Sequence, residues 1–316
     1  MGKKTWIALG GAAVVLLPLL SLGWTFVKRP LAVPAASVAP LPSPPAVDVG
    51  LSVLPTARIA TQHGFSVRGA PLTAPLTSAM VAFVVSHPEG RLLIDAGMGR
   101  NGVAHVDTTP RLMQLIVELE VSRGTADALA DHGVGPEDLH GVLLTHSHWD
   151  HVSGLEDLPG VPVWATAEEM AYIEDDEGAL LYRQIDAAEP VDLRELRFAG
   201  GAYGPFPRSA DIFGDGTVVA VPMPGHTPGS VGVFVNLPSG RRYLFIGDTA
   251  WAREGVDWPA EKPWLSRRMV DLDAEGVRAQ LVLLHQLQVQ HPELLVVPAH
   301  DERVHQGIAR FPDMER

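Results

Sequence analysis

The sequence of 316 residues contains no cysteine. That absence excludes disulfide bonds, thiolate metal ligands and a cysteine nucleophile, and it leaves the redox environment undetermined. Aromatic residues are scarce at 6%, and charged residues make up 19% against 46% hydrophobic ones, which is the composition of a folded protein rather than a disordered one. A chain of this length has enough material for one large domain or two modest ones.

Charge of either sign is missing from one long apolar segment, Thr5–Val27, which lies between two pairs of basic residues. A segment of this length can cross a bilayer once, and Trp6 and Trp24 lie near its ends, where tryptophan favours the headgroup level. We expect residues 1–29 to form a transmembrane or signal helix, and we favour an uncleaved anchor over cleavage after Ala39. Either interpretation places the body of the chain outside the cytoplasmic membrane, in the periplasm or at the cell surface.

The body of the chain lacks an excess of basic residues. Four of the 24 basic residues and none of the 37 acidic ones lie in residues 1–29, so the remainder carries 20 basic against 37 acidic side chains, a formal charge of −17. Such a surface repels phosphate backbones and anionic lipid headgroups. We therefore expect no nucleic-acid partner, and contact with a membrane through the N-terminal helix only.

A proline-rich linker is expected over residues 30–50. Six prolines fall between Pro30 and Pro45, and a tract of that kind is extended, reaching roughly 50 Å as polyproline II. It predicts a spacer that lifts the body off the membrane. Residues 51–316 then form one domain in which short apolar strands alternate with turns and helices, which favours an α/β fold of two mixed sheets between helical layers.

Several elements of that domain can be predicted from residue patterns. Asp273 is expected to be the N-cap of a long helix over residues 274–291. The other expected elements are a hairpin of two strands, a helix and a buried strand: Met80–Ser86 with Arg91–Asp95, Arg111–Val121, and Val142–Thr145.

The stretch LLTHSHWDHVSG at residues 143–154 places three histidines and an aspartate within six positions, directly after an apolar run. A turn after a strand can direct such residues at one point, which a straight strand or helix cannot do. The mixture of imidazole and carboxylate suits Zn²⁺ or a similar divalent ion. The candidate ligands are His146, His148, Asp150 and His151.

Three further donors have the same context, each after an apolar run and near a turn. They are His226 in GHTPGS, Asp248 in GDT and His300 in PAHD. The other eight histidines lack that context, and we expect most of them to be solvated: His63, His87, His105, His132, His140, His285, His291 and His305.

These segments, together with LLIDAG at residues 92–97, which contains Asp95, resemble in order the five motifs of the metallo-β-lactamase-fold hydrolases. The resemblance covers roughly Leu51 to Arg316 and implies an αββα four-layer sandwich. It implies two divalent metal ions, Zn²⁺ foremost, with Asp248 bridging them and Asp95 orienting a ligand histidine. The ligands of the two metals would be His146, His148 and His226 for one, and Asp150, His151 and His300 for the other.

Such a site would hydrolyse a carbonyl compound without a serine or cysteine nucleophile. Two ions, two carboxylates and a bridging hydroxide leave a net charge of about +1, which suits an electron-rich carbonyl oxygen. Asp150 would orient the hydroxide or shuttle its proton. The substrate would be a small molecule.

Within the family, Asp248 and the spacing of the motifs are similar to N-acyl homoserine lactone lactonases, which makes a lactone or simple ester the leading substrate. One departure is Trp251, which stands where those lactonases commonly have a tyrosine. Trp251, Trp258 and Trp264 could wall an apolar substrate pocket, or instead pack a helix or form a contact between two copies.

Other functions remain open from the sequence. The same site could hydrolyse a β-lactam or, as in glyoxalase II-like enzymes, a thioester. It could also hold a single iron as a sulfur dioxygenase, or belong to a binding module without catalysis. Pairing of two copies into a homodimer is open as well.

Overall fold

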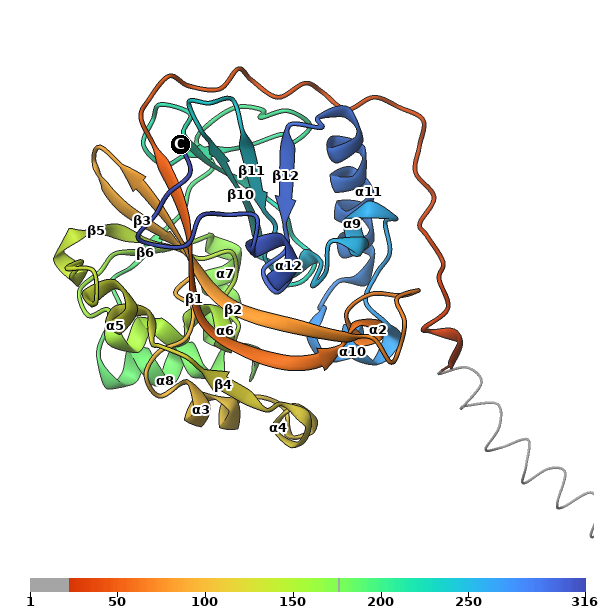
Figure 1. Cartoon of the computed structure of the whole chain (residues 1–316), viewed down its shortest axis with the longest axis horizontal. Helices are drawn as coiled ribbons and strands as arrows, with labels where there is room; N and C mark the ends of the chain where they lie inside the picture. Colours follow the sequence, from red (N-terminus) through yellow and green to blue (C-terminus); the bar gives the residue numbers. More distant parts are fainter. Residues whose placement is uncertain (1–22, 176) are drawn as a thin grey trace, which may run out of the picture.

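The computed structural model describes residues 23–175 and 177–316. Most of the predicted N-terminal anchor therefore lies outside the described residues. None of the helices in the described ranges has the length and apolar character that crossing a bilayer requires. The first described residues lie beside the body of the protein, and the chain forms its first strand at Gly50 (Figure 1).

Seven strands form the larger sheet, in the order β4-β1-β2-β3-β5-β6-β7. The N-terminal part, β1 to β3, is an antiparallel meander, whereas β3, β5, β6 and β7 pair in parallel. The strands are β1 (Gly50–Gln62), β2 (Pro75–His87), β3 (Gly90–Ile94), β4 (Leu119–Val121), β5 (Leu139–Leu143), β6 (Val163–Ala165) and β7 (Leu193–Glu195).

Five strands form the second sheet, in the order β12-β11-β10-β9-β8. Its central pairs are antiparallel, and β11 pairs in parallel with β12. The strands are β8 (Ala210–Asp211), β9 (Val218–Pro222), β10 (Val231–Asn236), β11 (Arg242–Phe245) and β12 (Leu294–Val297).

Helices cover the outer face of each sheet (Figure 1). On the side of the larger sheet lie α3 (Gly102–His105), η1 (Val106–Thr108), α4 (Arg111–Ile116), α5 (Thr125–Ala130), η2 (Pro136–Asp138), α6 (Trp149–Val152), η3 (Ser153–Asp157), α7 (Ala167–Asp175), η4 (Glu177–Ala179) and α8 (Leu180–Ala188). The remaining helices are α2 (His63–Ser66), η5 (Gly247–Thr249), α9 (Glu254–Asp257), α10 (Trp264–Val270), α11 (Ala274–Gln290) and α12 (Glu302–His305).

Three apolar cores separate the layers. One fills the space between the two sheets, where Phe83 of β2 packs against Phe245 of β11 with ring centroids 4.3 Å apart. A second lies between the larger sheet and its helices, and a third places Leu281 and Leu284 of α11 on the outer face of the smaller sheet. The order helix, sheet, sheet, helix confirms the α/β fold with mixed sheets that the sequence predicts, because each sheet alternates its apolar side chains between two cores.

The predicted elements are confirmed in part, and the buried strand expected over Val142–Thr145 is β5, which spans Leu139–Leu143. The hairpin is present as β2 and β3, and Asp273 caps α11 by accepting a hydrogen bond from the backbone N–H of Glu275 at 3.0 Å. The helix predicted over 111–121 is wrong in its second half, because α4 ends at Ile116 and β4 follows. There, Val121 pairs with Ala57 at the edge of β1, so strand pairing outweighs the helical apolar spacing.

The proline-rich linker is extended, but it does not lift the body away. Its residues pack against the third core through Leu31, Val38 and Leu41. The backbone N–H of Leu31 donates to the carbonyl of Pro259 at 2.7 Å, and Gln286 of α11 donates to the carbonyls of Pro34 and Ala36. The spacer prediction is therefore wrong, because the apolar side chains between the prolines pack against the third core. We call residues 30–50 the strap.

Candidate metal centre

The first cluster lies on the turn that joins β5 to α6. His146 and His148 belong to the turn, and Asp150 and His151 to the first residues of α6, after the apolar strand has ended at Leu143. His148 has an extended backbone and α6 begins at the next residue, so the backbone changes from extended to helical within the cluster. This change is what lets residues two and five positions apart face one point.

The other three donors follow strands of the smaller sheet. His226 lies in the turn after β9, Asp248 in η5 after β11, and His300 just after β12. Since β9, β11 and β12 run in the same direction, their carboxyl ends meet at one edge of that sheet. The backbone N–H of Val231 donates to the carbonyl of Thr145 at 2.9 Å, which holds this edge against the first cluster.

All seven candidate ligands converge there, in two subsets. In the first, Nε2 of His226 lies 3.2 Å from Nε2 of His146 and 2.9 Å from Nδ1 of His148. In the second, Nε2 of His300 lies 3.3 Å from Oδ2 of Asp150, and His151 completes the group. The donor atoms of each subset lie within 4.8 Å of one another, the spacing expected around a cation.

Asp248 lies between the subsets and directs one oxygen toward each. Its Oδ1 is 2.9 Å from Nε2 of His300 and 3.4 Å from Nε2 of His151. Its Oδ2 is 3.6 Å from Nε2 of His226. One carboxylate therefore faces both groups of imidazoles.

The donor chemistry fits a pair of divalent ions. Nε2 of His151 and Oδ1 of Asp248 are buried and make no hydrogen bond within the described chain, which is costly unless a cation satisfies them. Burial lowers the pKa of His146 and of His148 well below the ordinary value, so both imidazoles are neutral, the form that binds metal. In the second subset, burial opposes protonation of His151, but Asp95 and Asp150 outweigh it and raise its pKa.

Asp95 occupies the predicted orienting position. Its Oδ2 accepts from Nδ1 of His151 at 2.8 Å and from Oγ1 of Thr145 at 2.8 Å, and its Oδ1 accepts from the backbone N–H of Thr145 at 2.7 Å. Its φ of 59° lies in the left-handed region, which aspartate tolerates better than most residues. The carboxylate thereby fixes His151 with its other ring nitrogen facing Asp248.

The structure also reveals supporting residues that the sequence patterns do not single out. Glu169 is buried and accepts from Ser147 and Thr227, which neighbour His146 and His226, so it ties two ligand turns together. The hydroxyl of Tyr172 lies 3.0 Å from Nε2 of His148. The sequence sign of Glu169 is the threonine three residues before it: Oγ1 of Thr166 accepts from the backbone N–H of Glu169 at 3.1 Å, as in a capping box, while the side chain of Glu169 accepts from the backbone N–H of Ser147.

The three tryptophans after Asp248 have different surroundings. Trp251 is half-buried and donates its indole N–H to Oδ2 of Asp248 at 2.7 Å. Trp258 packs in a small apolar cluster around Val67, and Trp264 is 47% exposed. Of the three, only Trp251 contacts the candidate ligands. Trp149 is buried in the core, so its role is packing.

The prediction that most remaining histidines are solvated is wrong. Only His132 of the eight is in the exposed class. Several of the others pair with carboxylates, as His63 does with Glu254 at 3.1 Å and His87 with Asp215 at 2.9 Å. None of the eight belongs to the metal-ligand groups found among the described residues.

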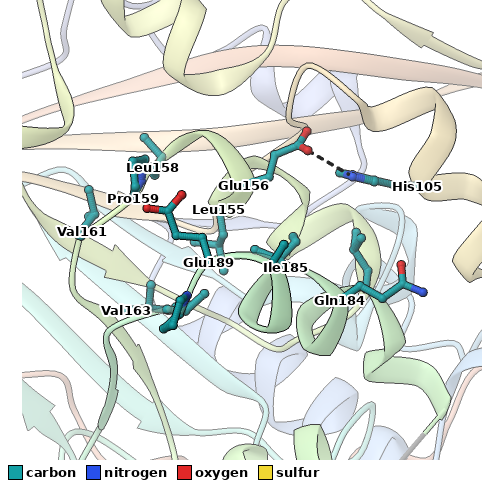
Figure 2. A pocket seen from close by; sticks show the side chains of 15 residues that line it. His105, Leu155, Glu156, Leu158, Pro159, Val161, Val163, Gln184, Ile185 and Glu189 are labelled. Carbon is teal, nitrogen blue, oxygen red and sulfur yellow. Dashed lines mark ion pairs between the residues drawn. The ribbon is translucent and has the colours of Figure 1, made fainter.

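A separate cavity of about 360 Å³ lies between η3, β6 and α8 (Figure 2). Its lining includes apolar residues such as Val161, Val163 and Ile185, and His105 pairs with Glu156 at its margin. It contains none of the seven candidate ligands, so it is distinct from the metal centre.

Comparison with known proteins agrees with this geometry. The sequence model of the Metallo-beta-lactamase superfamily matches residues 78–300, a range that contains Asp95 and all seven donors. The chain belongs to this superfamily. The expectation of a metal-dependent hydrolase of the metallo-β-lactamase superfamily is thereby confirmed.

Two relatives and one solved structure show which members of the superfamily this chain is similar to. A probable metallo-hydrolase of Mycobacterium tuberculosis is 28% identical over 71% of this chain and 74% of its own length. N-acyl homoserine lactonase AttM of Agrobacterium fabrum is 28% identical over 54% of this chain and 64% of its own length. A mutant of B. thuringiensis AiiA with N-decanoyl-L-homoserine at its active site superposes with a TM-score of 0.64 at 17% identity, over 85% of this chain and 100% of AiiA, which establishes a shared fold.

Proposed function

We propose that the protein is a dinuclear metal-dependent hydrolase that opens a lactone or simple ester. The observation that carries this proposal is the position of Asp248, whose two oxygens face two separate groups of donors. A single ion would need only one of these groups. The pair of groups fits two ions held a short distance apart, the arrangement that dinuclear hydrolases use.

Comparison with relatives supports a lactone as the substrate class. AttM carries the name of a lactonase, and AiiA was solved with a ring-opened acyl homoserine at its active site. This chain spans 64% of AttM, so the match covers much of that protein but not all of it. An acyl homoserine lactone is neutral, which suits a body with a net charge of −17 better than an anionic substrate does.

The residues of the centre have roles that follow from their positions. Divalent ions, when bound, would supply a Lewis acid and a water molecule whose pKa is near ~7. His146, His148 and His226 would hold one ion, and Asp150, His151 and His300 the other, with Asp248 shared. Asp150 would accept a proton from an attacking water and return it to the alcohol oxygen that leaves.

We expect substrate to reach the centre from the side of His148 and Trp251. These two residues are partly exposed, whereas the other candidate ligands and Asp95 are buried. A substrate carbonyl would therefore approach along the indole ring of Trp251, which can contact an acyl chain or the lactone ring. The N–H of that indole is already committed to Asp248, so Trp251 would bind substrate through its ring face.

Metal analysis followed by a substrate panel tests the proposal. We expect about two metal ions per chain and turnover of acyl homoserine lactones above that of simple esters, a thioester and a chromogenic cephalosporin. A metal content near zero in active protein would refute the dinuclear site. Faster turnover of the cephalosporin or the thioester would replace the lactone with that substrate, and oxygen uptake with a persulfide on an iron-containing protein would replace hydrolysis altogether.

For location, we propose that the N-terminal segment, residues 1–29, anchors the protein and that its body lies outside the cytoplasmic membrane. The support is the uncharged apolar sequence from Thr5 onward, flanked by basic residues. Cell fractionation and protease protection of the full chain test both parts. Recovery of the intact chain in the soluble cytoplasmic fraction would contradict the proposal.

A further inference from the structure

A buried lysine lies directly behind the first subset of ligands, which we call the first group: His146, His148 and His226. The side chain of Lys262 is 1% exposed, and its Nζ lies 2.7 Å from Oδ1 of Asp271 and 2.6 Å from the main-chain carbonyl oxygen of Asp248. Oδ1 of Asp271 in turn lies 2.8 Å from Nδ1 of His226. A chain of contacts therefore runs from Lys262 through Asp271 to one candidate ligand, and from Lys262 directly to the backbone of another.

The tautomer of His226 depends on this arrangement. His226 can present a lone pair at Nε2 only if its proton is at Nδ1, and Nδ1–H donates to the carboxylate of Asp271. The side chain of Asp271 is fully buried, so its negative charge needs a partner of opposite charge. Lys262 supplies that partner, and without it Asp271 would be an unpaired buried anion.

The same ammonium group fixes the turn that carries Asp248. It donates to the carbonyl of Asp248, while the indole of Trp251, whose ring centroid is 5.2 Å from Nζ, donates to the side chain of Asp248. Lys262 thus touches elements on both sides of the first group, and its position is set by the insert that follows Asp248 rather than by any of the five motifs.

We propose that Lys262 is a positioning residue that sets the affinity of the first metal group by holding Asp271 and the Asp248 turn. It contacts neither substrate nor reacting atoms. The inference rests on the proposed metal centre but not on the identity of the substrate, so it stands even if no lactone is hydrolysed.

The test is a metal titration of Lys262→Met, in which the side chain keeps its length and loses its charge. Competition with a chromophoric chelator and the visible spectrum of the Co²⁺ form report the two equivalents separately. We expect one equivalent to bind roughly 10- to 100-fold more weakly, and the other, which depends on Lys262 only through Asp248, to weaken less. The matched control is Lys28→Met, whose ammonium lies 3.8 Å above the ring of Trp258 and touches no candidate ligand.

A double variant keeps the test decisive if Lys262→Met folds poorly. Lys262→Met with Asp271→Asn removes both buried charges while leaving an amide oxygen to accept from His226. We expect the double variant to recover part of the lost affinity, so that the two effects are not additive. Wild-type affinity for both equivalents in Lys262→Met, or additive losses in the double variant, would overturn the role of Lys262.

A second and independent observation concerns the surface where the described chain begins. In Figure 1, α2, α10 and the residues before the strap lie next to one another, and each of these segments carries exposed apolar side chains. The ring of Phe26 meets that of Phe65 edge-on at 5.6 Å, and Oγ of Ser266 donates to the carbonyl of Phe65 at 2.8 Å, so these segments form one surface. The exposed apolar residues are Trp24, Val27, Phe65, Leu72 and Trp264; we call them the N-terminal face.

Basic side chains accompany the N-terminal face. Lys28, Arg29 and Arg268 are exposed there, although the body as a whole is acidic. The sequence that precedes Gly23 is the uncharged run from Thr5, and the strap holds the next segment against the body, so a membrane-inserted run would bring this face to the bilayer surface. Tryptophan and basic residues are the side chains that favour that depth.

We infer that the N-terminal face rests on a lipid bilayer, so that the body meets the membrane through this face as well as through the N-terminal segment. Because the chain has no cysteine, single cysteines can be labelled with an environment-sensitive fluorophore in the full protein. The sites are Leu72→Cys and Trp264→Cys, and the control is Val289→Cys, 66% exposed on α11. The protein is reconstituted in phosphatidylcholine vesicles containing phosphatidylglycerol.

We expect a blue shift and quenching by brominated lipid at positions 72 and 264 and neither at 289. Equal signals at the three sites would overturn the inference. A shift at 72 and 264 that depends on protein concentration rather than on lipid would instead show that a second copy covers this face. A signal at Leu115→Cys, on the exposed side of α4, would assign the membrane to that surface.

Discussion

The indole N–H of Trp251 donates to Oδ2 of Asp248 across 2.7 Å, three residues along the chain. In the lactonases that the motifs resemble, a tyrosine commonly stands at this position. Here the indole of Trp251 instead donates a hydrogen bond that holds the carboxylate of Asp248 in place. The position therefore keeps an aromatic ring beside the centre while its polar group serves the ligand set.

Replacing Trp251 tests that difference. Trp251→Phe removes a hydrogen bond to a buried carboxylate, which costs about 1.5–3 kcal/mol, so we expect metal affinity to fall at least tenfold. Trp251→Tyr should retain metal content, because a phenol can still donate. Metal titration of both variants checks this, with Trp264→Phe as the control. Unchanged affinity in Trp251→Phe would show that the contact contributes nothing.

Asp248→Ala should abolish both metal binding and hydrolysis. One residue serves both donor groups, so its removal should release about two ions rather than one. The measurement is metal content by elemental analysis alongside hydrolysis rate, with the exposed Asp107→Ala as the control. Retention of one tightly held ion in Asp248→Ala would mean that the two groups bind independently.

Asp95→Asn should weaken only the second group. Asparagine tolerates the φ of 59° that this position requires, so the backbone is preserved while the charge on the His151 hydrogen bond is lost. We expect affinity for one equivalent to fall roughly 10- to 100-fold. A Co²⁺ titration that shows the loss in the same equivalent as Lys262→Met would contradict the division into two groups.

His305 should make stability depend on pH. Burial lowers its pKa from 6.5 to about 4, while Nε2 donates to the carbonyl of Pro298. The unfolded chain takes up this proton near pH 6.5 and the folded chain only near pH 4, so stability is lost as pH falls through that window. The loss is about 2 kcal/mol at pH 5.

Denaturant unfolding at pH 7 and pH 5 in the presence of a chelator measures this loss apart from metal release. His305→Gln keeps a donor for Pro298 but does not titrate. The stability difference between wild type and this variant should therefore shrink by about 2 kcal/mol on acidification. A difference that stays constant would assign the acid sensitivity to other groups.

Much of the centre could be predicted from sequence because its ligands share a local signature. Each of the three later donors follows an apolar run that ends near a turn, and strands in an α/β fold place such ends together. The residues that support these ligands have no such sequence signature. Lys262 lies in an irregular insert and Asp271 directly after α10, and their buried pairing is specified only by tertiary structure.

Elements at the edges of the fold were also harder to predict. The sequence around Val121 has helical apolar spacing, yet it pairs with β1 because that edge strand is available. Burial of His63 and His87 likewise depends on partners more than 120 residues away, which a local pattern does not reveal.

Because the strap packs against the body, cleavage of the N-terminal segment would change the surface of the folded protein. Leu31 and Val38 cover part of the apolar surface beneath α9 and α11, and the backbone of Val38 bonds to Gln290. Cleavage by a peptidase after Ala39 would remove both side chains and expose the apolar surface that they cover on the released enzyme. Secreted and tethered forms would then differ in solubility and heat resistance, not only in where they reside.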